Sequence, residues 1–271
     1  MSRSASPFDG RTLLLAIIAI IALIAWQIIG GGLAVALLGA GGLLAVYLFL
    51  KGVFAAFIVG LAALFGRLRA VGLAGSVRPG SIIYGLPLIA LSALLALPLL
   101  QDGLTIPVSA AIGWSLMALF VSIGEETVFR GVLHRAVAPM GYWATAVITS
   151  VSFGAVHLLG LFSAMPPELI FVQSLMAACI GLVFFLVRQS EGSLWTVLFL
   201  HWLIDSCAFV AGGGITVPEN VTETMIGMLA VAAVMLGWAI PAMIIQKRRV
   251  DKNAAAPADP ATSPAVANSA A

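Results

Sequence analysis

Residues 124–131 read Gly-Glu-Glu-Thr-Val-Phe-Arg-Gly, which places two adjacent carboxylates and an arginine inside a long apolar run. An ionisable side chain at the centre of a membrane helix costs about 2.5–3.5 kcal/mol on insertion scales, so such residues are rare and usually functional. Glu125, Glu126 and Arg130 therefore mark this stretch as the place to expect a site.

The composition around this stretch is that of a membrane protein. The chain has 271 residues, of which 62% are hydrophobic and 9% charged, and its mean hydropathy is +1.13. A soluble core cannot bury so much apolar sequence, so lipid must cover much of the surface. The formal net charge of +2 forms no basic face, which excludes nucleic acid as a partner. Cys179 and Cys207 lie in apolar runs, where packing thiols are expected rather than a disulfide.

The fold class predicted is all-α, with about eight transmembrane helices of about 20 residues each. The first run follows Arg3 and Arg11, but it lacks a cleavage site and is expected to be retained as a span. Residues 53–65 are too short to cross, so they either extend the second helix past Lys51 or lie in the membrane interface. The expected spans are 12–29, 33–50, 81–100, 108–129, 142–162, 169–187, 194–210 and 223–245.

Charge in the connections predicts the orientation, because cytoplasmic loops carry an excess of Lys and Arg. Alternate connections are basic or acidic, which places both termini in the cytoplasm of what the composition suggests is a bacterial inner membrane. We expect a cytoplasmic segment at 1–11, a membrane domain at 12–246 and a disordered cytoplasmic tail at 247–271. The basic connections contain Arg67, Arg69, Arg78, His134, Arg135, Arg188 and residues 247–249, and the acidic ones contain Asp102, Glu168 and Glu219.

Three pairs of residues four positions apart share a helix face. They are Glu126 with Arg130, Phe153 with His157, and His201 with Asp205. If the carboxylate helix continues to about residue 138, Glu126 lies about 18 Å from its cytoplasmic end. His157 then lies about 24 Å into the next, antiparallel helix. Helix tilt can absorb that difference in depth, so one intramembrane site is expected.

These segments resemble the three ordered motifs of the CPBP family, the CAAX proteases and bacteriocin-processing enzymes that are also called Abi proteins. The motifs here are Glu125-Glu126-x-x-x-Arg130, Phe153-x-x-x-His157 and His201-x-x-x-Asp205, within a motif core at 124–205. Each motif alone is weak, but all three in this order on apolar helices are specific. The resemblance implies an intramembrane endopeptidase with a polar cavity that opens toward the cytoplasm.

The resemblance also implies roles for the residues. Glu125 would activate water together with His157, and His201 with Asp205 would face the developing oxyanion. Glu126 would support Glu125 through Arg130, and Phe153 would pack beside the site. The prenyl-protease branch has Asn where this chain has Asp205. An ionised Asp only accepts hydrogen bonds, so Asp205 would orient His201, stay neutral or help to hold a metal.

The sequence leaves the cofactor open between none and one divalent metal such as zinc. Glu125, His157 and His201 would form a His₂Glu set with an open position for water. No compact HExxH arrangement is present to favour that reading.

Two other functions fit the same residues. The chain could be a non-catalytic membrane scaffold or a bacteriocin immunity protein that keeps a buried ion-pair cluster for structure. It could also be a proton-coupled transporter, in which Glu, His and Asp relays occur, although no internal repeat or paired broken helix supports this. The expected partner is a peptide or protein substrate at the membrane, and the sequence does not specify which one or the oligomeric state.

Overall fold

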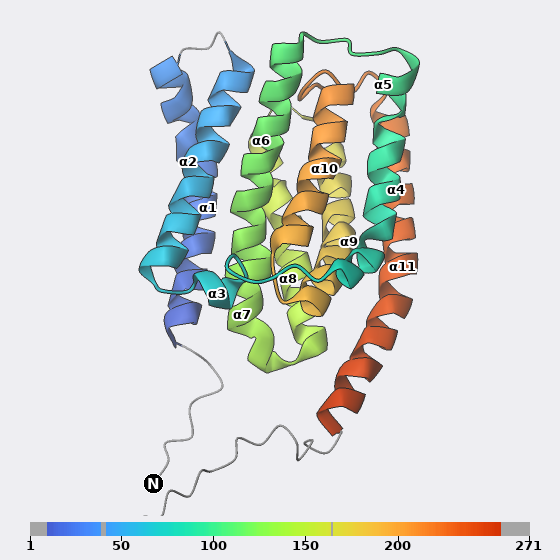
Figure 1. Cartoon of the computed structure of the whole chain (residues 1–271). Coiled ribbons are helices and arrows are strands. Elements are labelled where there is room, and N and C mark those ends of the chain that lie inside the picture. The colour runs from blue at the N-terminus through green and yellow to red at the C-terminus, as the bar shows by residue number, and fades with distance from the viewer. Residues whose placement is uncertain (1–9, 39–41, 164, 256–271) are drawn as a thin grey trace, which may run out of the picture.

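The computed structural model describes residues 10–38, 42–163 and 165–255, and within these ranges the chain forms helices and no strand (Figure 1). Six helical stretches are long and apolar enough to cross a membrane, and two shorter apolar stretches are Pro79–Leu95 and Trp195–Ala211. The predicted all-α polytopic fold is confirmed. Its elements are α1 (Gly10–Leu38), α2 (Leu43–Leu64), α3 (Leu68–Val71), η1 (Pro79–Gly85), α4 (Leu86–Leu95), α5 (Leu97–Gln101), α6 (Val108–Glu126), η2 (Thr127–Leu133), α7 (His134–Val137), η3 (Ala138–Met140), α8 (Tyr142–Val156), η4 (His157–Phe162), α9 (Pro167–Glu191), α10 (Trp195–Ala211) and α11 (Val221–Ala255).

The predicted second span, 33–50, is wrong. Helix α1 continues to Leu38 and α2 runs over Leu43–Leu64, so the expected span straddled the connection between two helices. Apolar sequence is nearly unbroken from residue 12 to 65, so hydropathy alone could not place the boundary. Residues 53–65 extend the second helix past Lys51, which was one of the two alternatives.

The predicted tail begins too early, because α11 stays helical to Ala255. The Lys247 ammonium lies 2.7 Å from the Asp251 carboxylate one turn later. Such a pair supports an isolated helix end by about 0.2–0.5 kcal/mol. Residues 1–9 and 256–271, which include most of the predicted N-terminal segment and the rest of the tail, lie outside the described residues.

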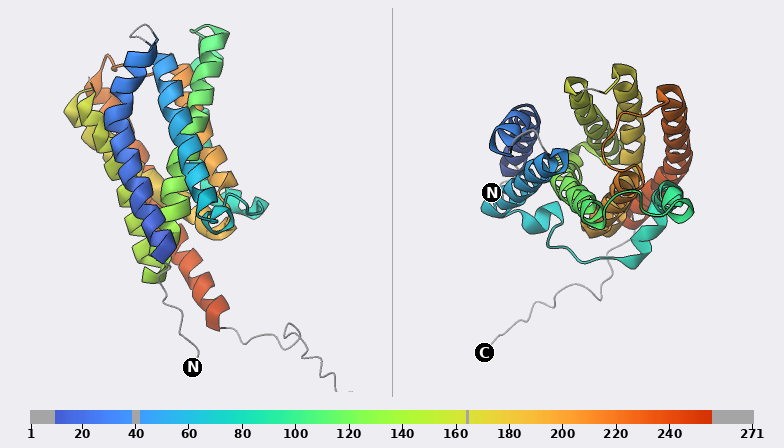
Figure 2. Two further views of the ribbon diagram at one scale, coloured as in Figure 1. Left: turned by 90° about the vertical axis from the view of Figure 1, so that its left-hand side faces the viewer. Right: turned by 90° about the horizontal axis from the view of Figure 1, so that it is seen from above.

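The bundle has two distinct ends (Figure 1). We call the end at which α1 begins and α11 ends the basic end, and the opposite end, at which α2 begins and α10 ends, the far end. Seen from above, α1 and α2 lie on one side of α6, and α11 lies on the other (Figure 2). The elements at the basic end carry Arg11, Arg67, Arg69, Arg78, Arg135, Arg188, Lys247, Arg248, Arg249 and Lys252.

Close contact between α8 and α9 depends on small residues. A Cβ added at Gly154 would lie 2.6 Å from the Ser174 carbonyl oxygen and 2.7 Å from the Ala178 Cβ. The Ser174 hydroxyl donates a hydrogen bond to the Gly154 carbonyl, at 2.8 Å. Glycine at this crossing lets the backbones approach, as is common between membrane helices. The contact fixes the part of α8 that leads directly to His157.

Candidate active site

The helix that carries the two carboxylates changes its winding directly after them. Helix α6 ends at Glu126, and Thr127–Leu133 form a π-helical segment that includes Arg130. Short π-helical segments inside α-helices are rare and occur frequently at functional sites. The helical path continues to Met140, so the predicted extension of this helix past Phe129 is observed.

Glu126 and Arg130 form the buried ion pair that their spacing predicted. Both side chains have no exposed surface, and Arg130 Nη1 lies 3.2 Å from Glu126 Oε1. Arg130 Nη2 also donates to the Gly181 carbonyl at 3.2 Å, and its own carbonyl accepts from Arg188 Nε at 2.9 Å. Removing one partner of such a pair leaves an uncompensated buried charge, which is destabilising by about 3–5 kcal/mol.

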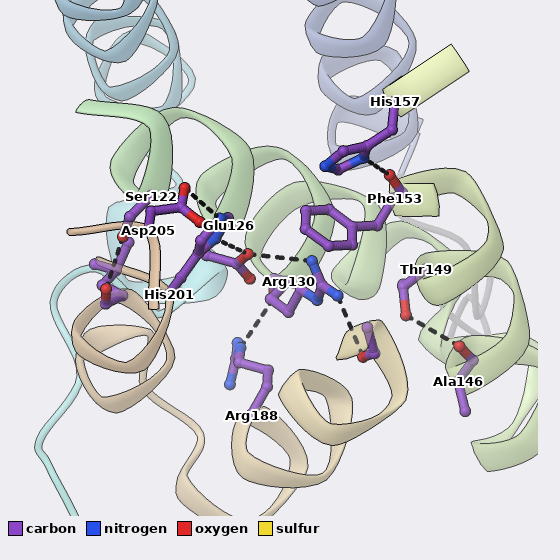
Figure 3. Close-up of polar contacts among 12 residues, drawn as sticks. Ser122, Glu126, Arg130, Ala146, Thr149, Phe153, His157, Arg188, His201 and Asp205 are labelled. Carbon is purple, nitrogen blue, oxygen red and sulfur yellow. Dashed lines mark hydrogen bonds and ion pairs between the residues drawn. The ribbon is translucent and has the colours of Figure 1, made fainter. Parts of the chain in front are cut away.

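His201 extends this pair into a network of charged groups from α6, η2 and α10. Its Nδ1 lies 2.7 Å from Glu126 Oε1, and its Nε2 lies 3.4 Å from Asp205 Oδ2. A neutral imidazole carries only one N–H, so it can donate to one carboxylate and not to both. The short contact on the Nδ1 side fixes the ring relative to Glu126, as Figure 3 shows.

On the side of this network that faces the basic end lies a layer of side chains that we call the aromatic floor. It consists of Phe129, Phe153, Phe184 and Arg130. The Arg130 guanidinium lies 4.2 Å from the Phe153 ring centroid and 5.0 Å from that of Phe184. Phe129 contacts the Phe153 ring edge to face, with centroids 5.5 Å apart. All four side chains are at most 2% exposed. A cation–π contact that excludes water contributes about 2 kcal/mol, so the floor adds to the stability of the arginine it surrounds.

His157 lies directly above Phe153 at the end of α8 (Figure 3). Its Nδ1 lies 2.9 Å from the Phe153 carbonyl oxygen, and the two rings meet edge to face at 5.1 Å. A carbonyl oxygen only accepts, so Nδ1 must carry the hydrogen in this contact. In the neutral ring, Nε2 then has a free lone pair that can accept a proton or bind a ligand.

Glu125 has a different partner from Glu126. Its Oε1 lies 3.9 Å from the Lys51 ammonium on α2, and its Oε2 is buried with no hydrogen-bond partner among the described residues. Successive residues of a helix point about 100° apart, so adjacent carboxylates face different neighbours. Glu126 therefore lies within the protein, while Glu125 faces α2.

A cavity of about 590 Å³ brings four of the predicted site residues together. Glu125, His157, His201 and Asp205 all line it, from α6, η4 and α10. Its volume falls within the range of about 300–1,000 Å³ that is usual for ligand sites. Glu126, Arg130 and Phe153 do not line the cavity and lie behind its wall.

Two kinds of contact are absent among the described residues. Among the described residues, no hydrogen bond or ion pair joins Glu125 to His157, although both line the cavity. Nor are any three His, Cys, Asp or Glu side chains of the described chain grouped closely enough to hold a metal ion. Glu125, His157 and His201 as placed thus do not fit a metal ligand set.

Some residues of the site were missed by sequence reasoning. The sequence analysis uses Lys51 only to mark the second helix, although a lone Lys in an apolar span is itself a signal of function. The charge pattern predicts a loop at Arg188, but this residue lies in α9, is 6% exposed and donates a hydrogen bond to the Arg130 carbonyl. Gln27 and Gln173 also line the cavity, and no spacing pattern linked them to it. The two cysteines, Cys179 and Cys207, are free, as expected.

Comparison with known families confirms the resemblance. Residues 107–207 match the family model of the type II CAAX prenyl endopeptidase Rce1-like domain. All three motifs lie within the matched segment, which supports an intramembrane endopeptidase at the level of the family. No curated protein and no solved structure matches the chain.

Proposed function

We propose that this protein is an intramembrane endopeptidase that hydrolyses a peptide bond of a membrane-associated polypeptide. The observation that supports this most is the cavity, since it joins a carboxylate, two imidazoles and a second carboxylate inside a bundle of apolar helices. Polar groups at such depth are expensive and mark functional sites. The match of residues 107–207 points to the same reaction class.

In the proposed reaction Glu125 is the general base. Its carboxylate takes a proton from water while the water oxygen attacks the scissile carbonyl carbon. The carbonyl oxygen becomes an oxyanion, and the C–N bond then breaks as Glu125 returns the proton to the leaving nitrogen. The products are a carboxylic acid and an amine, and the proton of the acid then passes to the amine or to water. The unpartnered Oε2 of Glu125 and its place in the cavity wall support this role.

His157 is proposed to hold the attacking water. Its Nδ1 contact with the Phe153 carbonyl leaves Nε2 as the acceptor in the neutral ring. An acceptor fixed by the backbone needs no reorganisation when the water loses its proton, which is how preorganised groups lower a barrier. Phe153 is then a positioning residue, through its carbonyl oxygen and through ring contacts.

His201 is proposed to act as an imidazolium, which donates its Nδ1–H to Glu126 and stabilises the oxyanion through its Nε2–H. Glu126 holds the other ring nitrogen at 2.7 Å, so the ring cannot turn away from the cavity. Asp205 lies 3.4 Å from Nε2, which supports the reading that it orients the imidazole rather than binding the oxyanion itself. Glu126 and Arg130 act as positioning residues because they lie behind the wall.

The proposal is tested with Glu125→Gln and His157→Gln in the full-length chain. The probe is a set of reporter proteins with one anchor helix and a randomised flanking peptide, and cleavage is read by gel shift. Removing a general base should lower cleavage by about 10²–10⁴-fold. The matched control is Glu223→Gln, an exposed carboxylate at the start of α11, which should cleave like the parent.

Melting curves in detergent must first show that each variant folds. If both site variants fold and cleave at the parental rate, the proposed function is wrong, and a scaffold role becomes the better account.

A further inference from the structure

The cavity is confined to one half of the bundle. On α2 its lining runs from Leu43 to Lys51 and no farther, although the helix continues to Leu64. On α10 it begins at His201 and continues past the helix end to Ile215. Because α2 begins and α10 ends at the far end, the cavity extends from the carboxylates toward that end (Figure 1).

The other two walls agree with this direction. Lining residues on α8 and η4 begin at Val156, close to the end of α8, and those on α9 stop at Gln173, close to its beginning. Element η4 ends and α9 begins toward the far end as well (Figure 2). All of these walls therefore place the open part of the cavity at the end of the bundle away from the basic residues.

The aromatic floor closes the cavity on the side of the basic end. Each of its residues lies farther toward the basic end than the lining residues of the same helical path. Arg130 follows Glu125, Phe153 precedes Val156, and Phe184 follows Gln173. All floor residues are buried, and the large buried side chains Phe185, Leu186 and Val187 continue the packing beyond it. The described residues thus leave access to the site from the far end.

We propose that the substrate reaches the active site from the non-cytoplasmic face of the membrane. The elements of the basic end carry the described Lys and Arg residues other than Lys51 and Arg130, which predicts that this end is cytoplasmic. The cavity then opens to the opposite face, whereas the family resemblance implied a cytoplasmic opening. The inference rests on the proposed function in taking the cavity as the substrate site.

The side chains at the open end of the cavity, which we call its mouth, restrict the class of substrate that can enter. Leu43, Phe162, Met165 and Ile215 surround it, and Phe162 is 81% exposed. An apolar mouth within a membrane helix bundle suits an apolar peptide segment that arrives through the lipid layer. The substrate is therefore a membrane-anchored polypeptide whose scissile bond lies at the non-cytoplasmic end of its anchor.

The first test measures access and does not depend on proteolysis. Gln173→Cys in the cavity wall and Met140→Cys at the basic end are each placed in a chain with Cys179→Ala and Cys207→Ala. A membrane-impermeant thiol reagent is added to vesicles of known orientation. We expect Gln173→Cys to react only from the non-cytoplasmic side and Met140→Cys only from the cytoplasmic side.

Labelling of Gln173→Cys from the same side as Met140→Cys overturns the proposal. Protection of Gln173→Cys from both sides, with labelling only after detergent is added, also counts against an open mouth.

The second test uses the parent protein and two single-anchor reporters. One reporter carries the same apolar cleavage segment on the non-cytoplasmic side of the anchor, and the other carries it on the cytoplasmic side. Cleavage of the first alone supports the inference, and cleavage of the second alone overturns it. Cleavage of neither counts against the proposed function, while the labelling pattern still decides the side of access.

Discussion

At the scale of single residues, Lys51 has the clearest consequence for activity. Its ammonium lies 3.9 Å from Glu125 Oε1, and both side chains line the cavity. This ion pair holds the Glu125 side chain in the cavity wall, where the proposed base must lie. Lys51 is thus a positioning residue of the proposed base.

Replacing Lys51 with Met should lower kcat for reporter cleavage about tenfold, which corresponds to about 1.4 kcal/mol of transition-state stabilisation. KM should change little, because the substitution removes charge rather than substrate contacts. Lys51→Arg keeps the charge and should restore most of the rate. A purely structural role would instead lower the melting temperature of Lys51→Met and leave the rate of the folded fraction intact.

The residue scale also shows what spacing can and cannot predict. The i,i+4 rule predicted the Glu126–Arg130 and His201–Asp205 contacts, and both are present. It could not say which of two adjacent carboxylates faces the cavity, because that depends on how α6 is rotated against α2 and α10. It also could not link His201 with Glu126, which are far apart in the chain and meet only through helix packing.

At the scale of elements, the crossing of α8 and α9 determines where His157 lies. Gly154 is three residues before His157 and touches the backbone of Ser174 and Ala178. Hydropathy located both helices correctly as 142–162 and 169–187, yet it carried no information about how closely they pack. The second span was misplaced for a different reason. An apolar run without polar breaks gives hydropathy no signal of where one helix ends and the next begins.

Gly154→Ala should destabilise the protein, because the added Cβ would lie 2.6 Å from a carbonyl oxygen. Overpacking of this kind costs about 1–3 kcal/mol, which corresponds to a fall in melting temperature of about 2–12 °C. Cleavage should fall as well, since α8 must shift together with His157. The matched control is Gly227→Ala in α11, where an added Cβ meets nothing within 4 Å. An unchanged melting temperature for Gly154→Ala would show that the helices separate without strain.

At the scale of the whole molecule, the distribution of charge predicts the orientation in the membrane. Acidic residues Asp102, Glu168 and Glu223 lie in elements of the far end, and the described Lys and Arg residues other than Lys51 and Arg130 lie in those of the basic end. Hydropathy and loop charge together predicted about eight crossings and termini on one side. In the described residues α1 begins and α11 ends at the same end, as that count requires (Figure 1).

Reporter fusions can measure this orientation. A phosphatase that is active only outside the cytoplasm should be inactive when fused after Ala255 and active when inserted at Gly103, where the chain passes from α5 to α6. A cytoplasmic fluorescent reporter should give the reverse pattern. Equal signals at the two positions would contradict the predicted orientation and, with it, the assigned side of the substrate.

The aromatic floor has a further consequence for the cell. A hydrolase inside a membrane must admit water, yet a pore through the bilayer would dissipate the electrochemical gradient that the membrane maintains. Phe129, Phe153 and Phe184, closed by the buried Arg130, interrupt any continuous file of water beneath the site. The layer that positions the proposed catalytic imidazoles would thus let a water-filled cavity exist in the membrane without a leak.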